Sequence, residues 1–280
     1  MPHFDFETPE PVSATVEFDI GAVRIIAGKR TDTVIEVLPA DAAAAADVRA
    51  AEQTKVTCAG GTLQVKGPRK RSMFGRSGSL DVRIELPAGS DVHGTSPMGD
   101  FHCTGRLGEC RIKTSYGDVH VDEAHTASLR TDLGDIHVSR VTGDAEVIAA
   151  GRIEVGEVEG AATVKNGNGA TTIGEVTGDL TANSSNGRLS VGVAHGGVEA
   201  KTAHGGIHIG ELVRGRANLL TATGDIEVGI RAATAAWLDV HTRLGGVRNT
   251  LTPFDGPGAG EETVEVRART GVGNIEIRRA

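Results

Sequence analysis

A glycine-led motif recurs along most of this sequence and constrains the fold more than any other feature. Each copy has a glycine, a small or polar residue, and then two apolar residues that flank a polar one. The regular copies are spaced 17 to 19 residues apart and start at Gly99, Gly117, Gly134, Gly151, Gly169, Gly187, Gly205 and Gly224. Weaker copies start at Gly245 and Gly273. A fixed period of about 20 residues indicates a repeat architecture.

A second alternating stretch precedes most lead glycines and places small or aliphatic residues on one face. It occupies residues 110–114, 162–166, 198–202, 217–221 and 238–242. Alternation with a period of two predicts a β-strand. An apolar corner residue such as Val158 or Leu212 lies between the two strands, and another glycine usually follows it. Each repeat is therefore expected to be a loop of short strands and glycine turns.

The length of the repeat predicts how these loops stack. A strand of about five residues spans ~17 Å, so two or three such strands with tight turns fill one coil. Coils stacked about 4.8 Å apart pair each strand with its neighbours above and below. We therefore predict an all-β, single-stranded β-helix (β-solenoid) with coils of about 18 residues. A β-sandwich, with turns every 8 to 12 residues, would not keep this face pattern in register.

The composition agrees with a thin β architecture. The 280 residues include 39 glycines but only six Phe, one Tyr and one Trp. Glycine suits corners where the backbone adopts positive φ, and a neighbouring Asp or Asn tolerates such turns. A core one or two aliphatic side chains thick leaves little room for rings.

The two ends of the chain depart from the repeat, and we expect them to close the solenoid. Residues 1–90 are predicted to be an N-terminal cap of strands with one short α-helix at 41–53, an alanine-rich stretch that starts at a good N-cap residue, Asp41. Residues 91–249 are predicted to form the coils, and residues 250–280 a loop followed by closing strands at 263–268 and 274–278. The whole is expected to be one continuous domain.

The order of these pieces resembles a known family. The residues that carry the resemblance are the helix at 41–53 after the strand 34–37 (VIEV), the strand 63–65 (LQV), the segment 82–89 (VRIELPAG) and the Gly-Asp-aliphatic coils that begin at Gly99. In these features the chain resembles the bacterial "putative adhesin" domain of unknown function, also called the toastrack domain. The resemblance implies a single β-helix without known catalytic residues, proposed to act in assembly or ligand sensing and sometimes linked to envelope-stress signalling.

Stacked coils turn repeat positions into columns, and two columns hold chemically interesting side chains. The position after the lead glycine carries Asp100, Asp118 and Asp135, and the position two further on carries His102, His120 and His137. Carboxylate and imidazole side chains at this spacing could bind a divalent metal or protons. The alternative is that the aspartates serve the turns and the histidines are ordinary exposed strand residues. No metal or cofactor is assigned, and these six residues remain the candidate sensing surface.

The chain lacks the sequence signatures of common catalytic sites. It has no nucleophile elbow, Walker loop, metalloprotease helix or paired cysteine ligands. Some β-helices act on polysaccharides, but the coils contain only Phe101, Tyr116 and Trp237 as aromatic residues. We therefore expect a non-enzymatic scaffold or binding module for a protein or peptide partner, with self-association as a further option. Metal or proton sensing and a carbohydrate-active enzyme are the alternatives.

Charge and cysteine content suggest the compartment and exclude some partners. The net charge of −8 argues against general nucleic-acid binding, and the basic cluster of Lys66, Arg69, Lys70, Arg71 and Arg76 is expected to be a solvated loop. Three cysteines without framework spacing indicate free thiols in the cytoplasm. No secretory signal is apparent, and no run reaches the ~18 apolar residues of a membrane span.

Overall fold

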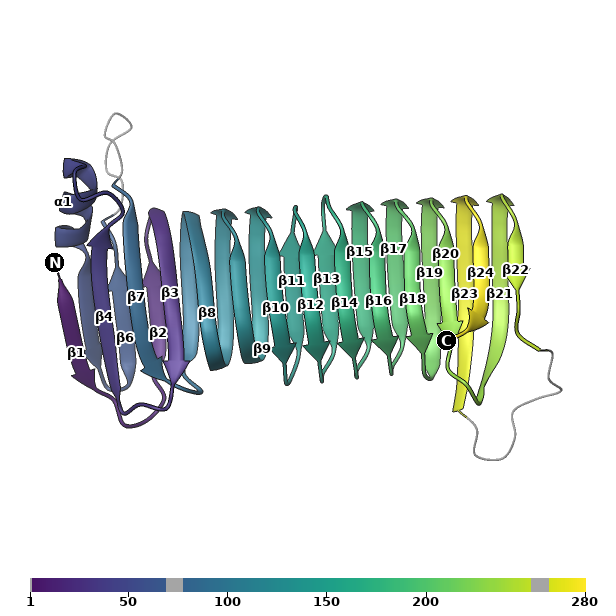
Figure 1. The fold of residues 1–280 in the computed structure, drawn as a ribbon, viewed down its shortest axis with the longest axis horizontal. Coiled ribbons are helices and arrows are strands. Elements are labelled where there is room, and N and C mark those ends of the chain that lie inside the picture. Colours follow the sequence, from purple (N-terminus) through teal and green to yellow (C-terminus); the bar gives the residue numbers. More distant parts are fainter. Residues whose placement is uncertain (1, 69–77, 253–261) are drawn as a thin grey trace. The chain divides into compact units, whose positions relative to one another are not determined.

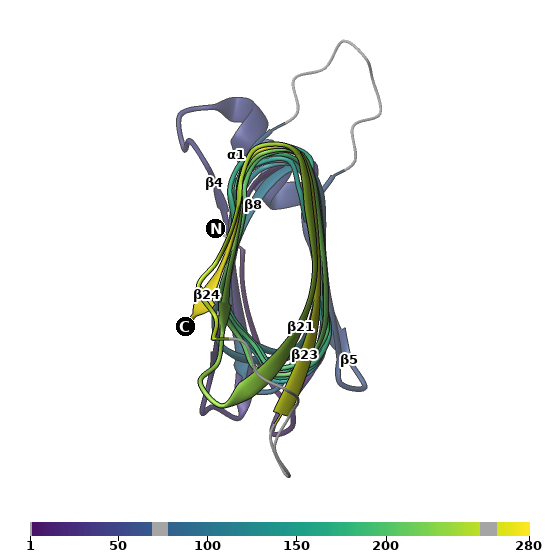
Figure 2. The same ribbon diagram turned by 90° about the vertical axis from the view of Figure 1, so that its right-hand side faces the viewer.

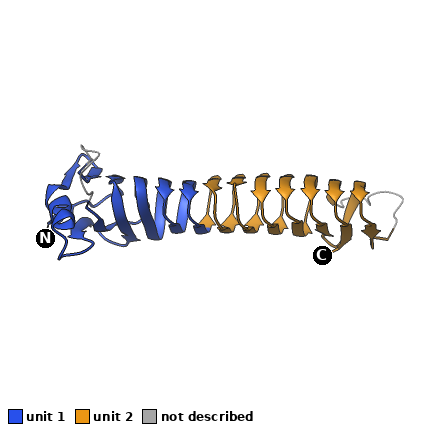
Figure 3. Ribbon diagram, turned by 90° about the horizontal axis from the view of Figure 1, so that it is seen from above, with its two compact units in different colours: residues 1–139 blue, residues 140–280 orange. Residues whose placement is uncertain are grey.

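A computed structural model describes residues 2–68, 78–252 and 262–280 of the chain and confirms the predicted β-solenoid. The chain divides into two compact units, Met1–Ser139 and Arg140–Ala280, and each is described by itself (Figure 3). The expectation of one continuous domain stays a prediction. Four of the five residues of the basic cluster, all but Lys66, lie outside the described residues.

The first unit combines a mixed β cap with the first coils (Figure 1). Its elements are β1 (His3–Glu7), β2 (Ser13–Glu17), β3 (Ile20–Gly28), β4 (Asp32–Pro39), α1 (Ala45–Gln53), β5 (Lys55–Ala59), β6 (Thr62–Lys66), β7 (Leu80–Pro87), β8 (Asp91–Tyr116) and β9 (Val119–Leu133). Strand β10 (Ile136–Val141) spans the division between the units. In the cap, β1 and β7 pair antiparallel with β4, and β5 pairs antiparallel with β6. The coils begin where β8 pairs in parallel with β2, β3 and β9.

The helix begins later than the sequence predicted, at Ala45 rather than at Asp41. Ala44 occupies the N-cap position and makes no side-chain capping bond. Asp41 instead accepts a hydrogen bond from the amide of Ala43 at 2.8 Å, which closes a turn before the helix. Asp47 in the first helical turn accepts the amide of Ser79 at 3.0 Å, so it ties the helix to the start of β7. Asp41 is therefore a turn residue, as short acidic side chains often are.

The second unit consists of parallel coils, each with two main strands. Its strands are β11 (Ala145–Ala149), β12 (Ile153–Val158), β13 (Ala162–Asn166), β14 (Thr171–Val176), β15 (Leu180–Asn186), β16 (Leu189–Ala194), β17 (Val198–His204), β18 (Ile207–Leu212), β19 (Gly215–Thr223), β20 (Ile226–Ile230), β21 (Thr234–Leu244), β22 (Val247–Asn249), β23 (Glu262–Val272) and β24 (Ile275–Arg279). Seen end on, these coils are flattened loops (Figure 2). Odd-numbered strands pair in parallel along one face and even-numbered strands along the other.

The last coils are not stacked in the order of the sequence. Strand β23 pairs in parallel with both β19 and β21, and β24 pairs with both β20 and β22. The coil formed by β23 and β24 is therefore inserted between its two predecessors (Figure 1). Residues 234–249, not the C-terminal strands, form the outermost coil. The sequence predicted closing strands in the last segment but did not reveal this exchange of order.

The core is the narrow column of alternating side chains inside the coils. Ile153, Ile173, Ile209, Ile226 and Ile275 are all fully buried on one face. The opposite face contributes smaller residues such as Ala182 and Ala200, also fully buried. Because each aliphatic side chain stacks on its equivalent in the next coil, apolar burial is continuous along the unit.

The corner at the lead glycine explains why the repeat keeps this residue. Gly187 has φ of +118°, and a Cβ atom there would lie 2.1 Å from the carbonyl oxygen of Gly169 in the preceding coil. Its amide donates to the carbonyl of His204 in the following coil at 2.8 Å. A side chain would therefore strain the backbone and force adjacent coils apart.

Replacing Gly187 by alanine should lower the free energy of unfolding by about 3 kcal/mol or more, because both φ and the contact with Gly169 oppose a side chain. Urea denaturation followed by circular dichroism measures this. Gly246→Ala is the matched control, since a Cβ atom there would be 3.6 Å from its nearest neighbour, Asn274 Oδ1, and its cost should be below about 1 kcal/mol. Equal losses in the two variants would contradict this explanation.

Candidate functional site

A row of exposed apolar side chains follows one edge of the coils in the first unit. Met98, Tyr116 and Leu133 each occupy the position before a lead glycine, and these residues are 49%, 53% and 52% exposed. Ile20 precedes Gly21 and pairs with Met98 across β3 and β8, and Tyr116 pairs with Leu133 across β8 and β9. We call Ile20, Met98, Tyr116 and Leu133 the apolar row. Isolated exposed apolar residues are common, but a contiguous row is a candidate interaction surface.

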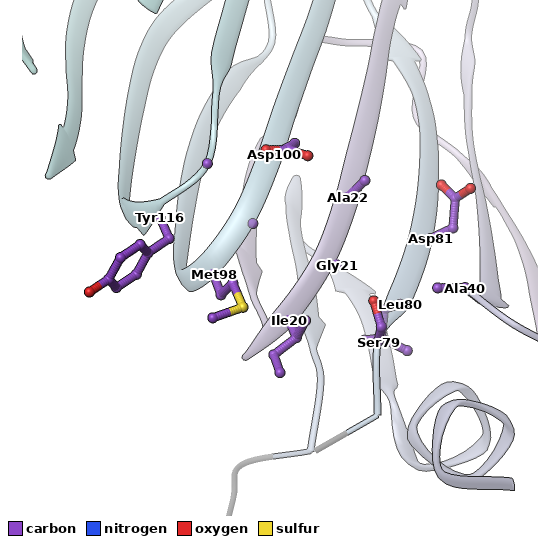
Figure 4. A pocket seen from close by; sticks show the side chains of 12 residues that line it. Ile20, Gly21, Ala22, Ala40, Ser79, Leu80, Asp81, Met98, Asp100 and Tyr116 are labelled. Atoms are coloured by element: carbon purple, nitrogen blue, oxygen red, sulfur yellow. The ribbon is translucent and has the colours of Figure 1, made fainter. Parts of the chain in front are cut away.

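An open groove of about 500 Å³ runs beside this row (Figure 4). Ile20, Met98 and Tyr116 lie along it, and Leu80 and Ala40 line the part nearest the cap. Gly21, Gly99 and Gly117 contribute only backbone, so the glycine corners that set the coil geometry also hollow out this surface. The sequence analysis placed Tyr116 in a coil but did not identify the apolar row. The pattern that could have revealed the row is the apolar residue that precedes several lead glycines.

The charged side chains that line the groove, Asp81 and Asp100, are both acidic. A further acid, Asp132, lies next to Leu133 in the row. A hydrogen bond from Arg130, with support from Ser115 and the charges of Arg130 and Lys113, outweighs desolvation and lowers the pKa of the Asp132 carboxyl. At neutral pH Asp132 is therefore ionised, and the cations Arg130 and Lys113 lie beside it.

The predicted aspartate column is present, and its carboxylates serve the backbone. Asp100 Oδ1 accepts the amide of Asp118 at 2.9 Å, and Asp118 Oδ1 accepts the amide of Asp135 at 2.8 Å. The second unit repeats the arrangement at another corner, where Asp179 Oδ1 accepts the amide of Gly197 at 2.8 Å. Each such aspartate thus links one coil to the next, which fits the turn-residue interpretation of the column.

The predicted histidine column is also present, and its rings stack. The ring centroids of His102 and His120 are 4.5 Å apart and those of His120 and His137 are 4.7 Å apart, with interplanar angles of 13° and 7°. His120 Nε2 lies 3.2 Å from Asp122 Oδ1, and His137 Nε2 lies 3.3 Å from Ser139 Oγ. Each of these two rings therefore has a polar partner on its own strand.

This arrangement does not bring the six candidate residues together as a metal site. Two nitrogen ligands on one tetrahedral zinc ion lie about 3.3 Å apart and point at the same centre. The imidazole rings instead stack face to face, and the carboxylates of Asp100 and Asp118 accept backbone amides. Within residues 2–68, 78–252 and 262–280, no group of three or more His, Cys, Asp or Glu side chains could hold a metal ion. Proton sensing by the histidine stack stays a prediction.

The cysteines offer no exposed nucleophile in the coils. Cys103 and Cys110 are buried and free, and Cys58 is half-buried. A hydrogen bond with Cys103, together with desolvation, raises the pKa of the Cys110 thiol well above its usual value. Because the thiolate is the reactive form, Cys110 is a core residue with low reactivity.

The fold and these surfaces define a β-solenoid with an apolar, acidic groove. A family model described as Toastrack DUF4097 matches residues 22–279, and the chain belongs to this family. A comparison with curated proteins gives no match.

Solved structures with overall similarity have low sequence identity. A putative adhesin from Bacteroides fragilis is 13% identical with a TM-score of 0.38, and the alignment covers 99% of this chain and 96% of that one. A putative cell adhesion protein from Clostridium sporogenes is 11% identical with a TM-score of 0.21, covering 100% and 99%. A putative adhesin from Parabacteroides merdae is 9% identical with a TM-score of 0.29, covering 99% and 95%.

The described part of the chain contains no helix long and apolar enough to cross a membrane. Its helix α1 has nine residues.

The structural role of the aspartate column can be tested at Asp118. Asp118→Ala removes the acceptor for the amide of Asp135 and should cost about 1 kcal/mol of unfolding free energy. Asp118→Asn keeps an acceptor oxygen and should cost less than half as much. Thermal and urea unfolding of the two variants give the comparison. If both variants lose the same stability, the negative charge rather than the hydrogen bond is what this position requires.

Proposed function

We propose that this protein is a non-enzymatic binding module whose apolar row and groove hold a protein or peptide partner. The observation that carries the proposal is that Met98, Tyr116 and Leu133 are each about half exposed, in one continuous row. Inward-facing residues three positions further along the chain, such as Val119 after Tyr116 and Ile136 after Leu133, are fully buried, so the exposed row is not a consequence of loose packing. Membership of the Toastrack family, to which the resemblance assigns no catalytic residues, supports a non-enzymatic role.

The chemistry of the groove indicates the kind of partner. Three coils of the first unit present an apolar side chain, a glycine and then an aspartate: Met98-Gly99-Asp100, Tyr116-Gly117-Asp118 and Leu133-Gly134-Asp135. One oxygen of Asp100 and of Asp118 accepts a backbone amide, which leaves each carboxylate with a second oxygen and its charge. A segment with apolar residues beside Lys or Arg complements this pattern, because its cations would lie next to the acids.

We further propose that the module works in a reducing compartment such as the cytoplasm. Two buried cysteines, Cys103 and Cys110, lie within hydrogen-bonding reach and remain free thiols. Disulfides are rare where thiol reductants are abundant, and free neighbouring thiols suit such surroundings.

Selection from a phage-displayed random peptide library tests the binding proposal, with the full chain as bait. We expect enriched peptides in which Lys or Arg alternates with apolar residues. Tyr116→Ser should weaken the binding of these peptides about tenfold or more, as truncation of an aromatic anchor does. Isothermal titration calorimetry of synthetic peptides measures the affinity.

Leu220→Ser is the matched control, because Leu220 is 47% exposed but belongs to β19 of the second unit and is not part of the apolar row. It should leave peptide affinity unchanged. The proposal fails if the library yields no enriched sequence, or if Leu220→Ser weakens binding as much as Tyr116→Ser.

A further inference from the structure

The outermost coil of the second unit has strands that are paired on one side only. Strand β21 pairs with β23, and β22 pairs with β24. Among residues 140–252 and 262–280, no strand pairs with their other edges. Strand β21 has 11 residues, so it presents a long row of backbone donors and acceptors at this edge.

The side chains of this coil confirm that the core is open at this end. Val247 occupies the position held by Ile275 and Ile226 in the two preceding coils. It is 46% exposed, whereas both isoleucines are fully buried. Leu238 and Val240 are half-buried, although their paired residues Val266 and Ala268 are fully buried. Repeat proteins need polar terminal caps, and the described residues supply none here.

Strand β21 also lacks several of the features that usually protect an edge, and its only Asp and Arg residues, Asp239 and Arg243, lie on its outward face. Natural edge strands carry lysine, proline, inward-facing charges or bulges that prevent pairing with another chain. The sequence TAAWLDVHTRL contains no lysine or proline, and its pairing with β23 runs without a register shift. Its inward positions are apolar or threonine, and Trp237 is 66% exposed. The edge is therefore suited to a further strand.

The backbone directions show which residues would pair. The carbonyl of Leu244 accepts the amide of Gly273, so Leu244 directs its backbone polar groups toward the β23–β24 coil. Because these directions alternate along a strand, the backbone groups of Trp237, Asp239, His241 and Arg243 face the free edge.

We propose that two copies of this chain associate end to end, with β21 of one copy pairing antiparallel with β21 of the other about a two-fold axis at Val240. In this register Asp239 lies opposite His241 of the second copy, and Trp237 lies opposite Arg243 of the second copy. Both contacts occur twice, as two-fold symmetry requires. The first joins an acid to a base, and the second allows a cation–π contact. The half-buried side chains of Leu238 and Val240 become covered by the second copy.

Charge distinguishes this register from its neighbour. Centring the pair on Asp239 would maximise the overlap of the strands, but it would place two carboxylates directly opposite each other, which is unfavourable. Moving the axis to Val240 removes this repulsion. Within one copy, Arg269 Nη2 on β23 donates a hydrogen bond to Asp239 Oδ2 at 3.0 Å. This bond holds the Asp239 side chain in position.

Sedimentation velocity of the full chain over a wide range of concentrations tests the proposal. The wild-type chain should form a species of two copies. His241→Pro should keep the chain monomeric, because proline removes an amide that faces the free edge without removing a bond to β23. Thermal unfolding checks that this variant still folds.

Charge substitutions at His241 give a second test that does not depend on proline. His241→Glu places an acid opposite Asp239 of the second copy and should weaken dimerisation about tenfold, whereas His241→Lys should not weaken it. Within one copy, His241 pairs with Arg269, so monomer stability should change in the opposite direction. His204→Glu on β17 is the charge-matched control and should leave the dimer unchanged.

A wild-type chain that stays monomeric at all concentrations would overturn the proposal. Dimers that persist in His241→Pro would place the interface elsewhere, and growth beyond two copies would indicate head-to-tail contacts rather than a two-fold pair. The binding groove lies in the other unit, so failure of peptide binding would leave this result unaffected.

Discussion

The corner at the lead glycine is the constraint on which the stacking depends. Glycine is needed because a Cβ atom at Gly187 would meet the backbone of the coil before it. On the inside of the corner, Thr221 donates to the carbonyl of Gly205 and Thr270 donates to that of Gly224, both at 2.9 Å. On the outside, an aspartate accepts an amide of the next coil, as Asp225 accepts that of Asn274 at 2.7 Å. The polar groups of the corner are thus satisfied between coils, which holds successive coils in one register.

Because every coil offers the same corner, these bonds do not require coils that are neighbours in space to be neighbours in the sequence. Thr270 bonds to Gly224, and Thr242 bonds to Gly273 at 2.8 Å, so the coil of β23 and β24 follows the coil of β19 and β20. The last strands of the chain, β23 and β24, thus form the penultimate coil, and β21 and β22 form the outermost coil.

The sequence was sufficient to predict the coils, because the glycine spacing and the alternation report the same local geometry. It also predicted the aspartate and histidine columns, since a fixed period places equivalent residues side by side. It could not predict the exchanged order, because Gly245 and Gly273 fit the same corner equally well. The start of α1 was missed because Asp41 satisfies a turn as readily as a helix N-terminus. The apolar row was missed because the position before the glycine is variable: it is Tyr116 in one coil and Asn186 in another.

The central claim, that the coil of β23 and β24 lies between the coil of β19 and β20 and the coil of β21 and β22, can be tested by disulfide formation between paired cysteines. Asn218 pairs with Arg267, and Arg267 pairs with Asp239, so two coil spacings separate Asn218 from Asp239. Neighbouring strands are about 4.8 Å apart, which a disulfide can bridge, whereas twice that distance is too long. Under mild oxidation, Asn218→Cys with Arg267→Cys should cross-link readily, and Asn218→Cys with Asp239→Cys should not. Efficient cross-linking of the second pair, with none in the first, would show that the coils follow the order of the sequence and would contradict this account.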